Sequence, residues 1–156
     1  MTSQIESRLA ELNIHIPEAA APAANYVPYT LTGTLVFVSG QITIENGEIR
    51  YRGKVGEDFS VEEAQRAARL CALNLVSQLR AACGGDLDRV RRVVKLGGFV
   101  NSAPDFNEQH LVINGASDLM VEVFGDAGRH ARAAVGVSAL PLGVAVEVDG
   151  VFEISP

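Results

Sequence analysis

The chain has 156 residues, which is enough for one domain built around one hydrophobic core. Its formal net charge is −6, and the only basic cluster is Arg89, Arg91, Arg92 and Lys95, so a nucleic-acid-binding protein is not expected. No apolar run reaches the roughly eighteen residues of a membrane span, which excludes a helical membrane protein.

Cysteine usage and the N-terminus both predict a cytoplasmic protein. Cys71 and Cys83 fall in or near one helical stretch, roughly 18 Å apart along a helix, which is too far for a disulfide. The N-terminus shows no apolar signal segment. Reduced thiols are typical of the cytoplasm.

The chain begins with a short helical pattern. Thr2 or Ser3 can cap a helix that runs through Leu12, with apolar residues on one stripe. We expect residues 1–16 to form a helical extension and residues 17–156 to form a single domain.

Extended chain follows. The Pro-rich residues 17–22 predict a linker, and Leu35–Ser39 predicts a strand buried on both sides. The strand is expected to continue through Ile44, to turn at Asn46-Gly47 and to return over residues 48–52.

Two helices and a strand occupy the middle of the chain. Ser60 and Glu63 form a capping box, and the helix behind it is expected to reach about Ala82, with Cys71 in its buried stripe. Val90–Val100 predicts a strand whose Gly97-Gly98 pair indicates a bulge or a close backbone approach.

A second helix is expected to begin at Pro104 or Asp105 and to run through Phe124, with Gly125 and Gly128 ending it. Gly115 weakens the middle of this helix.

His130–Val151 predicts two strands around a turn at residues 140–143, as a closing hairpin. Side chains alternate between the two faces of a strand, so Arg132 lies on one face with small residues beside it. These small residues leave room above the backbone for a small anion. The second strand places Glu147 opposite a valine face. The alternative is a solvated sheet face that carries an ion pair.

These elements predict an α+β fold, with a mostly antiparallel sheet and two helices packed on one face. Two helices cannot cover every strand valine, so we expect self-association to complete the core. The valines in question are Val36, Val38, Val135, Val137, Val144 and Val146.

Several motifs together resemble the RidA/YjgF family, also described as endoribonuclease L-PSP. They recur in the family order from about Pro22 to Ile154: VSGQI at 38–42, the strand at 90–101, RAAV at 132–135, LP at 140–141 and VEV at 146–148. The resemblance implies a chorismate-mutase-like fold and a homotrimer with ligand clefts between subunits. It also implies hydrolysis of reactive enamine and imine intermediates, such as 2-aminoacrylate, to 2-oxo acids and ammonia.

The resemblance also implies roles for individual residues. Arg132 matches the arginine that holds the substrate carboxylate, and Glu147 matches the glutamate that helps to position the attacking water. Tyr26 matches the family tyrosine, with Tyr29 as a rival. Gly40 matches the glycine whose backbone lines the cleft.

Two matches depart from the family pattern. Ala134 stands where the family often has a cysteine whose backbone carbonyl is thought to hold water. His110 aligns loosely with a helix residue that is usually Asn, because the segment before Arg132 is a few residues longer here. With its N-terminal extension, the chain therefore resembles a side branch of the family, in which the substrate differs or the deaminase activity is lost.

The chemistry of the implied site is consistent with a small carboxylate substrate and needs no cofactor. A guanidinium grips a carboxylate through two parallel hydrogen bonds, and an imine hydrolyses without a metal. No metal site is expected, because His110 and His130 lie far apart in the sequence. A non-catalytic trimer that binds small carboxylates is the alternative function, and a ribonuclease is the weakest one.

Overall fold

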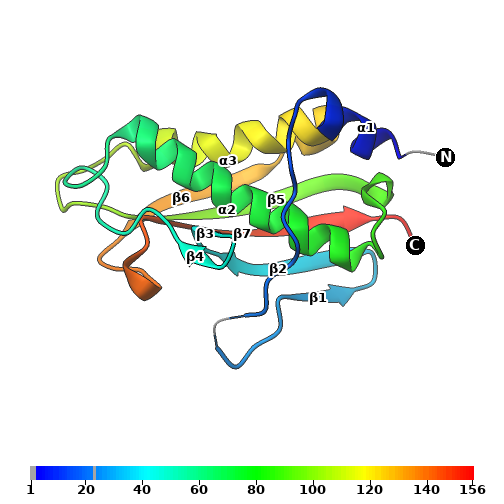
Figure 1. Cartoon of the computed structure of the whole chain (residues 1–156), viewed down its shortest axis with the longest axis horizontal. Helices are drawn as coiled ribbons and strands as arrows, with labels where there is room; N and C mark the ends of the chain where they lie inside the picture. Colours follow the sequence, from blue (N-terminus) through cyan, green and yellow to red (C-terminus); the bar gives the residue numbers. More distant parts are fainter. Residues whose placement is uncertain (1–2, 23) are drawn as a thin grey trace.

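Five strands form the main sheet of the computed structural model, which describes residues 3–22 and 24–156. They lie in the order β1-β2-β7-β5-β6, and a separate two-stranded ribbon pairs β3 with β4 (Figure 1). The bounds are β1 Tyr29–Thr32, β2 Leu35–Gln41, β3 Ile44–Glu45, β4 Glu48–Ile49, β5 Val90–Asn101, β6 Ala131–Val137 and β7 Val146–Ile154.

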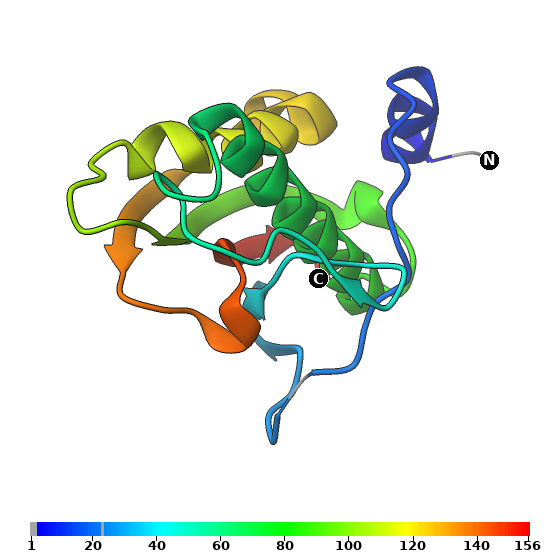
Figure 2. The same ribbon diagram turned by 60° about the vertical axis from the view of Figure 1, so that its left-hand side comes forward.

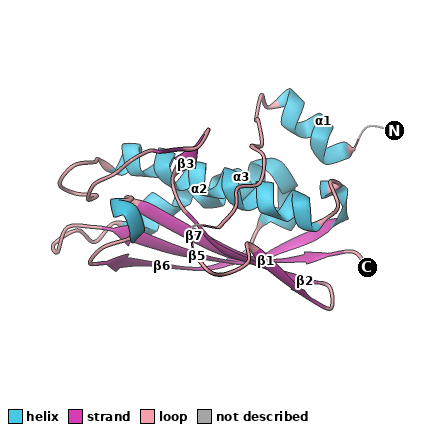
Figure 3. Cartoon of the chain, turned by 60° about the horizontal axis from the view of Figure 1, so that its bottom comes forward, coloured by secondary structure: helices cyan, strands magenta, loops and turns pink. Residues whose placement is uncertain are grey.

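Helices α2 (Val61–Ala82) and α3 (Gln109–Phe124) lie side by side on one face of this sheet, as the side view in Figure 3 shows. The predicted capping box is present. The Glu63 backbone N–H donates to the Ser60 hydroxyl, and the Ser60 backbone N–H donates to the Glu63 carboxylate. Cys71 is fully buried among the core residues, as its place in the apolar stripe predicts. The expected α+β architecture, with two helices on one sheet face, is confirmed.

The last two strands do not form the expected hairpin. Strand β6 pairs with β5 in parallel, and β7 pairs with β5 in antiparallel register, so β5 lies between them. Alternation tells which residues share a face but not which strand is the neighbour. Strands β1 and β6 are consequently the two edges of the sheet.

The apolar surface of the uncovered sheet face also differs from the expectation. Val36, Val38, Val144 and Val146 are buried, with exposed fractions between 0% and 4%. The uncovered face, called the open face below, instead presents two exposed apolar side chains, Phe37 and Val135. Between and beside them lie Phe99, Val151, Glu147 and Asp149, which the strand register places on the same face.

Strand β2 is buried on one side only, since Phe37 is 43% exposed between the buried Val36 and Val38. Its register against β7 shifts between Val38 and Gln41, which marks a bulge at Ser39-Gly40. The strand also ends at Gln41 instead of continuing to Ile44, and β3 begins after this break.

Helix α3 begins later than expected, at Gln109 rather than at Pro104 or Asp105. The preceding residues belong to the sheet end of the chain, because the Ala103 backbone N–H donates to the Val55 carbonyl. The Phe106 N–H then closes a turn onto the Ala103 carbonyl. Residues 103–106 therefore form a bonded turn at the end of the sheet, and the helix begins only after it.

The close approach predicted at Gly97-Gly98 is present. A Cβ on Gly98 would lie 2.5 Å from the Ile113 side chain of α3, so the missing side chain lets this helix settle on β5. Gly115 has the same role on the other side of α3, where an added Cβ would collide with the Gln65 carbonyl of α2.

The N-terminal helix α1 (Gln4–Glu11) packs beside α3 at one end of the molecule (Figure 1). Ser3 caps it through a bond from the Glu6 N–H, while the rival cap Thr2 lies outside the described residues. Leu9 is 3% exposed and joins the core. Among the described residues, no helix has both the length and the hydrophobicity needed to cross a bilayer.

Candidate functional site

A cavity of about 470 Å³ opens beside the bulge of β2. Its lining residues come from the N-terminal segment, the β2–β3 region, helix α2, the β6–β7 connection and strand β7. Three of them, Tyr26, Gly40 and Glu147, are residues to which the family resemblance assigns a site role. The others are Ala20, Ala21, Pro22, Ala24, Pro28, Gln41, Ile42, Ile44, Gln78, Pro141 and Leu142.

Glu147 lies directly against Gly40. A Cβ on Gly40 would be 2.9 Å from the Glu147 carboxyl carbon and closer still to one of its oxygens, so only glycine leaves this carboxylate in place. Burial raises the pKa of the Glu147 carboxyl, and the neighbouring Asp149 carboxylate raises it further. A carboxyl group of this kind can accept and return a proton nearer to neutral pH than a solvated one.

The Ser-Gly-Gln motif fixes the backbone around this contact. The Ser39 hydroxyl donates to the Val27 carbonyl at 2.8 Å, and the Ser39 N–H donates to the Pro28 carbonyl at 2.9 Å. The Gln41 amide donates back to the Ser39 carbonyl at 3.0 Å. These bonds hold the segment before β1 against the bulge, and they place Tyr26 at the cavity.

The structure separates the two tyrosines that the sequence leaves as rivals. Tyr26 is 47% exposed and lines the cavity. Tyr29 pairs with Val38 in the sheet and packs against the hydrophobic core. Tyr26 is therefore the tyrosine that stands near Glu147.

Arg132 lies elsewhere, on edge strand β6 beneath helix α3. Its Nη1 donates to Asn114 Oδ1 at 2.9 Å and to Ser117 Oγ at 3.1 Å, and its Nη2 donates to the His110 carbonyl at 3.0 Å. All three acceptors are neutral. In the part of the chain that the structure describes, Arg132 forms no ion pair with a carboxylate.

A guanidinium has five N–H donors, so the three bonds to α3 leave two for a ligand, the number that a bidentate carboxylate accepts. The expectation that the face around Arg132 is open above the backbone is wrong, because α3 covers it. Ala134 lies on the same covered face and packs against the core.

His110 reaches Arg132 only through its backbone carbonyl, and its side chain is exposed. The side-chain amide contact comes instead from Asn114, one helical turn later, and Ser117 adds a hydroxyl after another. Sequence reasoning missed both residues. Their i, i+3 spacing on one helix face was the available signal.

His130 extends this polar cluster. Its Nδ1 lies 2.6 Å from the Gly128 carbonyl, which can only accept, so in the neutral ring the proton sits on Nδ1. The Nε2 atom, 2.8 Å from Ser117 Oγ, then accepts from that hydroxyl. The Ser117 lone pairs are thereby turned toward Arg132.

Within one chain, Arg132 and Glu147 do not meet. Glu147 is in register with Phe99 and Val135 on the open face, whereas Arg132 is in register with Leu96, which is fully buried under the helices. The structure therefore brings together Tyr26, Gly40 and Glu147 as one group, and it places Arg132 with the His110 backbone as another.

Cys71 offers no alternative nucleophile. Its thiol donates to the Val146 carbonyl, and burial strongly raises the pKa of this thiol, so it stays protonated. Within the described residues, His, Cys, Asp and Glu side chains nowhere gather in threes that could hold a metal ion.

Comparison with known proteins places this architecture in a family. Residues 6–152 match the family model described as "YjgF/chorismate_mutase-like, putative endoribonuclease". A Trypanosoma cruzi protein named "Protein TCP17" is 52% identical over 155 residues, which cover 99% of this chain and 96% of that protein.

Solved structures agree with this match. The protein Atu1372 of Agrobacterium tumefaciens, described as having unknown function, is 55% identical with a TM-score of 0.90, covering 97% of this chain and 92% of its own. E. coli TdcF, solved with bound serine, is 25% identical with a TM-score of 0.63, covering 88% of this chain and 94% of its own. The chain belongs to the RidA/YjgF family and has its chorismate-mutase-like fold.

Proposed function

We propose that this protein hydrolyses reactive enamine and imine intermediates, 2-imino acids related to 2-aminoacrylate, to 2-oxo acids and ammonia. The observation that carries the proposal is Arg132, a partly buried guanidinium whose three intrachain partners are neutral and which keeps two donors for a carboxylate. The serine bound to TdcF, an amino acid with a carboxylate, supports a small-carboxylate ligand for this fold.

The proposal requires a homotrimer in which the two groups of residues meet across a subunit interface. One subunit supplies Arg132, and its neighbour supplies Glu147, Gly40 and Tyr26. The open face, with the exposed Phe37 and Val135, supports such an assembly, because apolar surface of this kind is normally covered in the functional oligomer.

In the proposed reaction, Arg132 holds the substrate carboxylate and thereby fixes the position of the adjacent C2 atom. Water adds to C2 of the protonated imine, forming the new C–O bond, and Glu147 takes the proton that the water loses. The C–N bond of the resulting carbinolamine then breaks. Glu147 returns its proton to the nitrogen, ammonia leaves, and the hydroxyl gives its own proton back to the Glu147 carboxylate as its oxygen becomes the carbonyl of the 2-oxo acid.

The Ala134 carbonyl is proposed to help hold this water, and the Gly40 backbone to line the cleft, as the family match implies. The exposed His110 side chain is free to contribute at the rim, but Asn114 is the better-placed polar group of α3 because it already holds Arg132. With free, buried thiols at Cys71 and Cys83, we place the protein in the cytoplasm.

A coupled assay tests the activity. An amino-acid oxidase generates the imino acid, catalase removes peroxide, and ammonia release is followed with and without the protein. The wild type should accelerate release, and Arg132→Lys should lose most of this acceleration because an ammonium lacks the fork that serves α3 and substrate together. An absence of acceleration, while an active family member works in the same assay, refutes the deaminase proposal.

A non-catalytic carboxylate-binding trimer is the second candidate, since Arg132 would serve it equally well. Its signature is thermal stabilisation by pyruvate or 2-oxobutyrate in the wild type, lost in Arg132→Ala, with no turnover. Cleavage of RNA, which the family description names, is less consistent with a net charge of −6 and a carboxylate in the cavity.

A further inference from the structure

The segment between α1 and β1, residues 12–22 and 24–28, is called the N-terminal arm below. It runs from α1 past α2 to the β1 edge of the sheet (Figures 1 and 2). Three polar side chains of α2 hold its backbone carbonyls. Ser77 Oγ donates to Pro17 at 2.6 Å, Gln78 Nε2 to Ala20 at 2.8 Å and Arg80 Nη2 to Ile16 at 3.2 Å.

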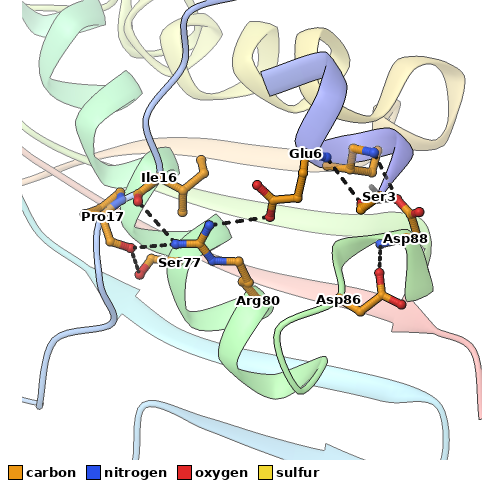
Figure 4. A network of polar contacts seen from close by, with 9 residues as sticks. Ser3, Glu6, Ile16, Pro17, Ser77, Arg80, Asp86 and Asp88 are labelled. Carbon is orange, nitrogen blue, oxygen red and sulfur yellow. Dashed lines mark hydrogen bonds and ion pairs between the residues drawn. The ribbon is translucent and has the colours of Figure 1, made fainter. Parts of the chain in front are cut away.

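Both ends of the arm are fastened as well. At the α1 end, Arg80 pairs with Glu6 at 3.5 Å, and the Asp88 carboxylate accepts from the Ser3 hydroxyl at 2.6 Å (Figure 4). At the β1 end, Ser39 holds the carbonyls of residues 27 and 28, as described above. The arm is thus fixed along its length by side chains of the domain.

This fixed course makes the arm one wall of the cavity that contains Glu147. Six lining residues belong to the arm: Ala20, Ala21, Pro22, Ala24, Tyr26 and Pro28. Apart from the Tyr26 hydroxyl, their side chains carry no polar atom. Ile42, Ile44 and Leu142 add further hydrocarbon, and Glu147 is the one charged residue in this lining.

A cavity of about 470 Å³ falls within the range of sites that enclose small organic ligands. The imine tautomer of 2-aminoacrylate has only a methyl group to place against the hydrocarbon wall. A branched aliphatic side chain would remove that wall from water, and the gain in free energy grows with the apolar area covered.

We propose that the N-terminal arm makes this site selective for 2-imino acids with aliphatic side chains of about four carbons, such as the one derived from leucine, over the imine tautomer of 2-aminoacrylate. The side chain lies against the arm while the imine nitrogen lies at Glu147. This inference rests on the proposed deaminase function and names its substrate class.

The test compares two substrates made by the same oxidase, the imino acids from leucine and from alanine. Wild type should hydrolyse the leucine-derived compound with the higher kcat/KM. Ala21→Phe fills the cavity space beside the arm and should lower the leucine-to-alanine ratio of kcat/KM by about tenfold or more. Ala19→Phe is the matched control, because Ala19 is an exposed arm residue outside this cavity, and it should leave the ratio unchanged.

A second variant tests the anchoring. Gln78→Met removes the bond to the Ala20 carbonyl at similar side-chain volume, and it should raise KM for the leucine-derived substrate with little change for the alanine-derived one. If the wild type hydrolyses both substrates equally and Ala21→Phe affects both alike, the inference is overturned while the deaminase function stands. If neither is hydrolysed, the proposed function itself fails and the inference fails with it.

Discussion

At the scale of single residues, the contact between Gly40 and Glu147 is the most informative feature of the cavity. A glycine is required there because a carboxylate occupies the place of its side chain, not because the backbone is strained. The same carboxylate is partly desolvated, and this burial, together with the Asp149 carboxylate, raises its pKa.

Gly40→Ala should therefore abolish most activity at little cost in stability. The added Cβ displaces the end of a flexible side chain, which is a cheap movement for the fold, but it moves the proposed proton acceptor. We expect kcat to fall by about 10² or more, the contribution typical of a positioned acid–base group. Steady-state kinetics and thermal unfolding measure the two effects. A variant that keeps its kcat would show that Glu147 does no proton transfer.

Glu147→Gln should stabilise the protein at neutral pH. The folded state raises the pKa of this carboxyl, so its neutral form is favoured by folding. The corresponding stability is present below the ordinary carboxyl range of about 4 to 4.5 and is lost as pH rises through the higher folded pKa. The glutamine amide is neutral at every pH, so the variant does not lose this stability as the pH rises.

Thermal midpoints of Glu147→Gln and wild type should therefore diverge between pH 4 and pH 8, with the variant higher at pH 8. Glu57→Gln, at an exposed loop position, is the control and should not show this divergence. Equal midpoints at pH 8 would contradict the buried-charge argument.

At the scale of elements, the packing of α2 on α3 depends on a glycine that weakens the helix containing it. Gly115 allows the α3 backbone to approach the Gln65 carbonyl of α2, and Gly98 allows α3 to approach β5. Helix α3 is consequently held from both sides, and it carries the acceptors that position Arg132.

Gly115→Ala should destabilise the fold although alanine is the better helix former. The intrinsic gain of about 1 kcal/mol is smaller than the cost of forcing two backbones apart, which we place at about 1–3 kcal/mol. Urea denaturation measures the difference. Asp118→Ala, at an exposed position of the same helix, should instead be neutral or stabilising. A stabilised Gly115→Ala would show that the helices separate at no cost.

Local features of the elements could be predicted from the sequence, whereas their neighbours in space could not. The capping box at Ser60 and the buried stripe with Cys71 follow from residues a few positions apart, and both are confirmed. The β7-β5-β6 order was missed because strand pairing is set by contacts far apart in the chain.

The candidate site shows the same division. Family motifs pointed to Tyr26, Gly40 and Glu147, and the structure places all three at one cavity. The small residues beside Arg132 were interpreted as leaving open space. At Gly136, however, the side chains of Gln109 and Ser102 occupy the space that a Cβ would need. Asn114 was missed because its spacing from Ser117 shows only that the two share a helix face, and the three-dimensional fold is needed to show that this face lies over Arg132.

At the scale of the whole molecule, the separation of Arg132 from Glu147 decides between a site shared by two subunits and a site within one chain. The two residues lie on opposite faces of the sheet, so a lone chain cannot apply both to one small substrate. The proposed trimer solves this by combining the Arg132 side of one subunit with the cavity of the next.

Mixed oligomers test this arrangement. Arg132→Ala and Glu147→Gln should each be inactive, but co-expression should restore about a quarter of wild-type activity, since random mixing makes one site in four intact. Separate expression followed by mixing without dissociation is the control and should restore nothing. Failure of the co-expressed, size-verified oligomer to recover activity would mean that no site draws these residues from different subunits.

Strand β6 ends the sheet with the backbone of residues 131–137 unpaired on one side, and its only charged side chain, Arg132, is turned under α3. Exposed edges that lack charged or proline residues are templates for adding foreign strands. A subunit freed from the proposed trimer by dilution would therefore be prone to fibrous aggregation, and conditions that dissociate that trimer should also be those in which the protein precipitates.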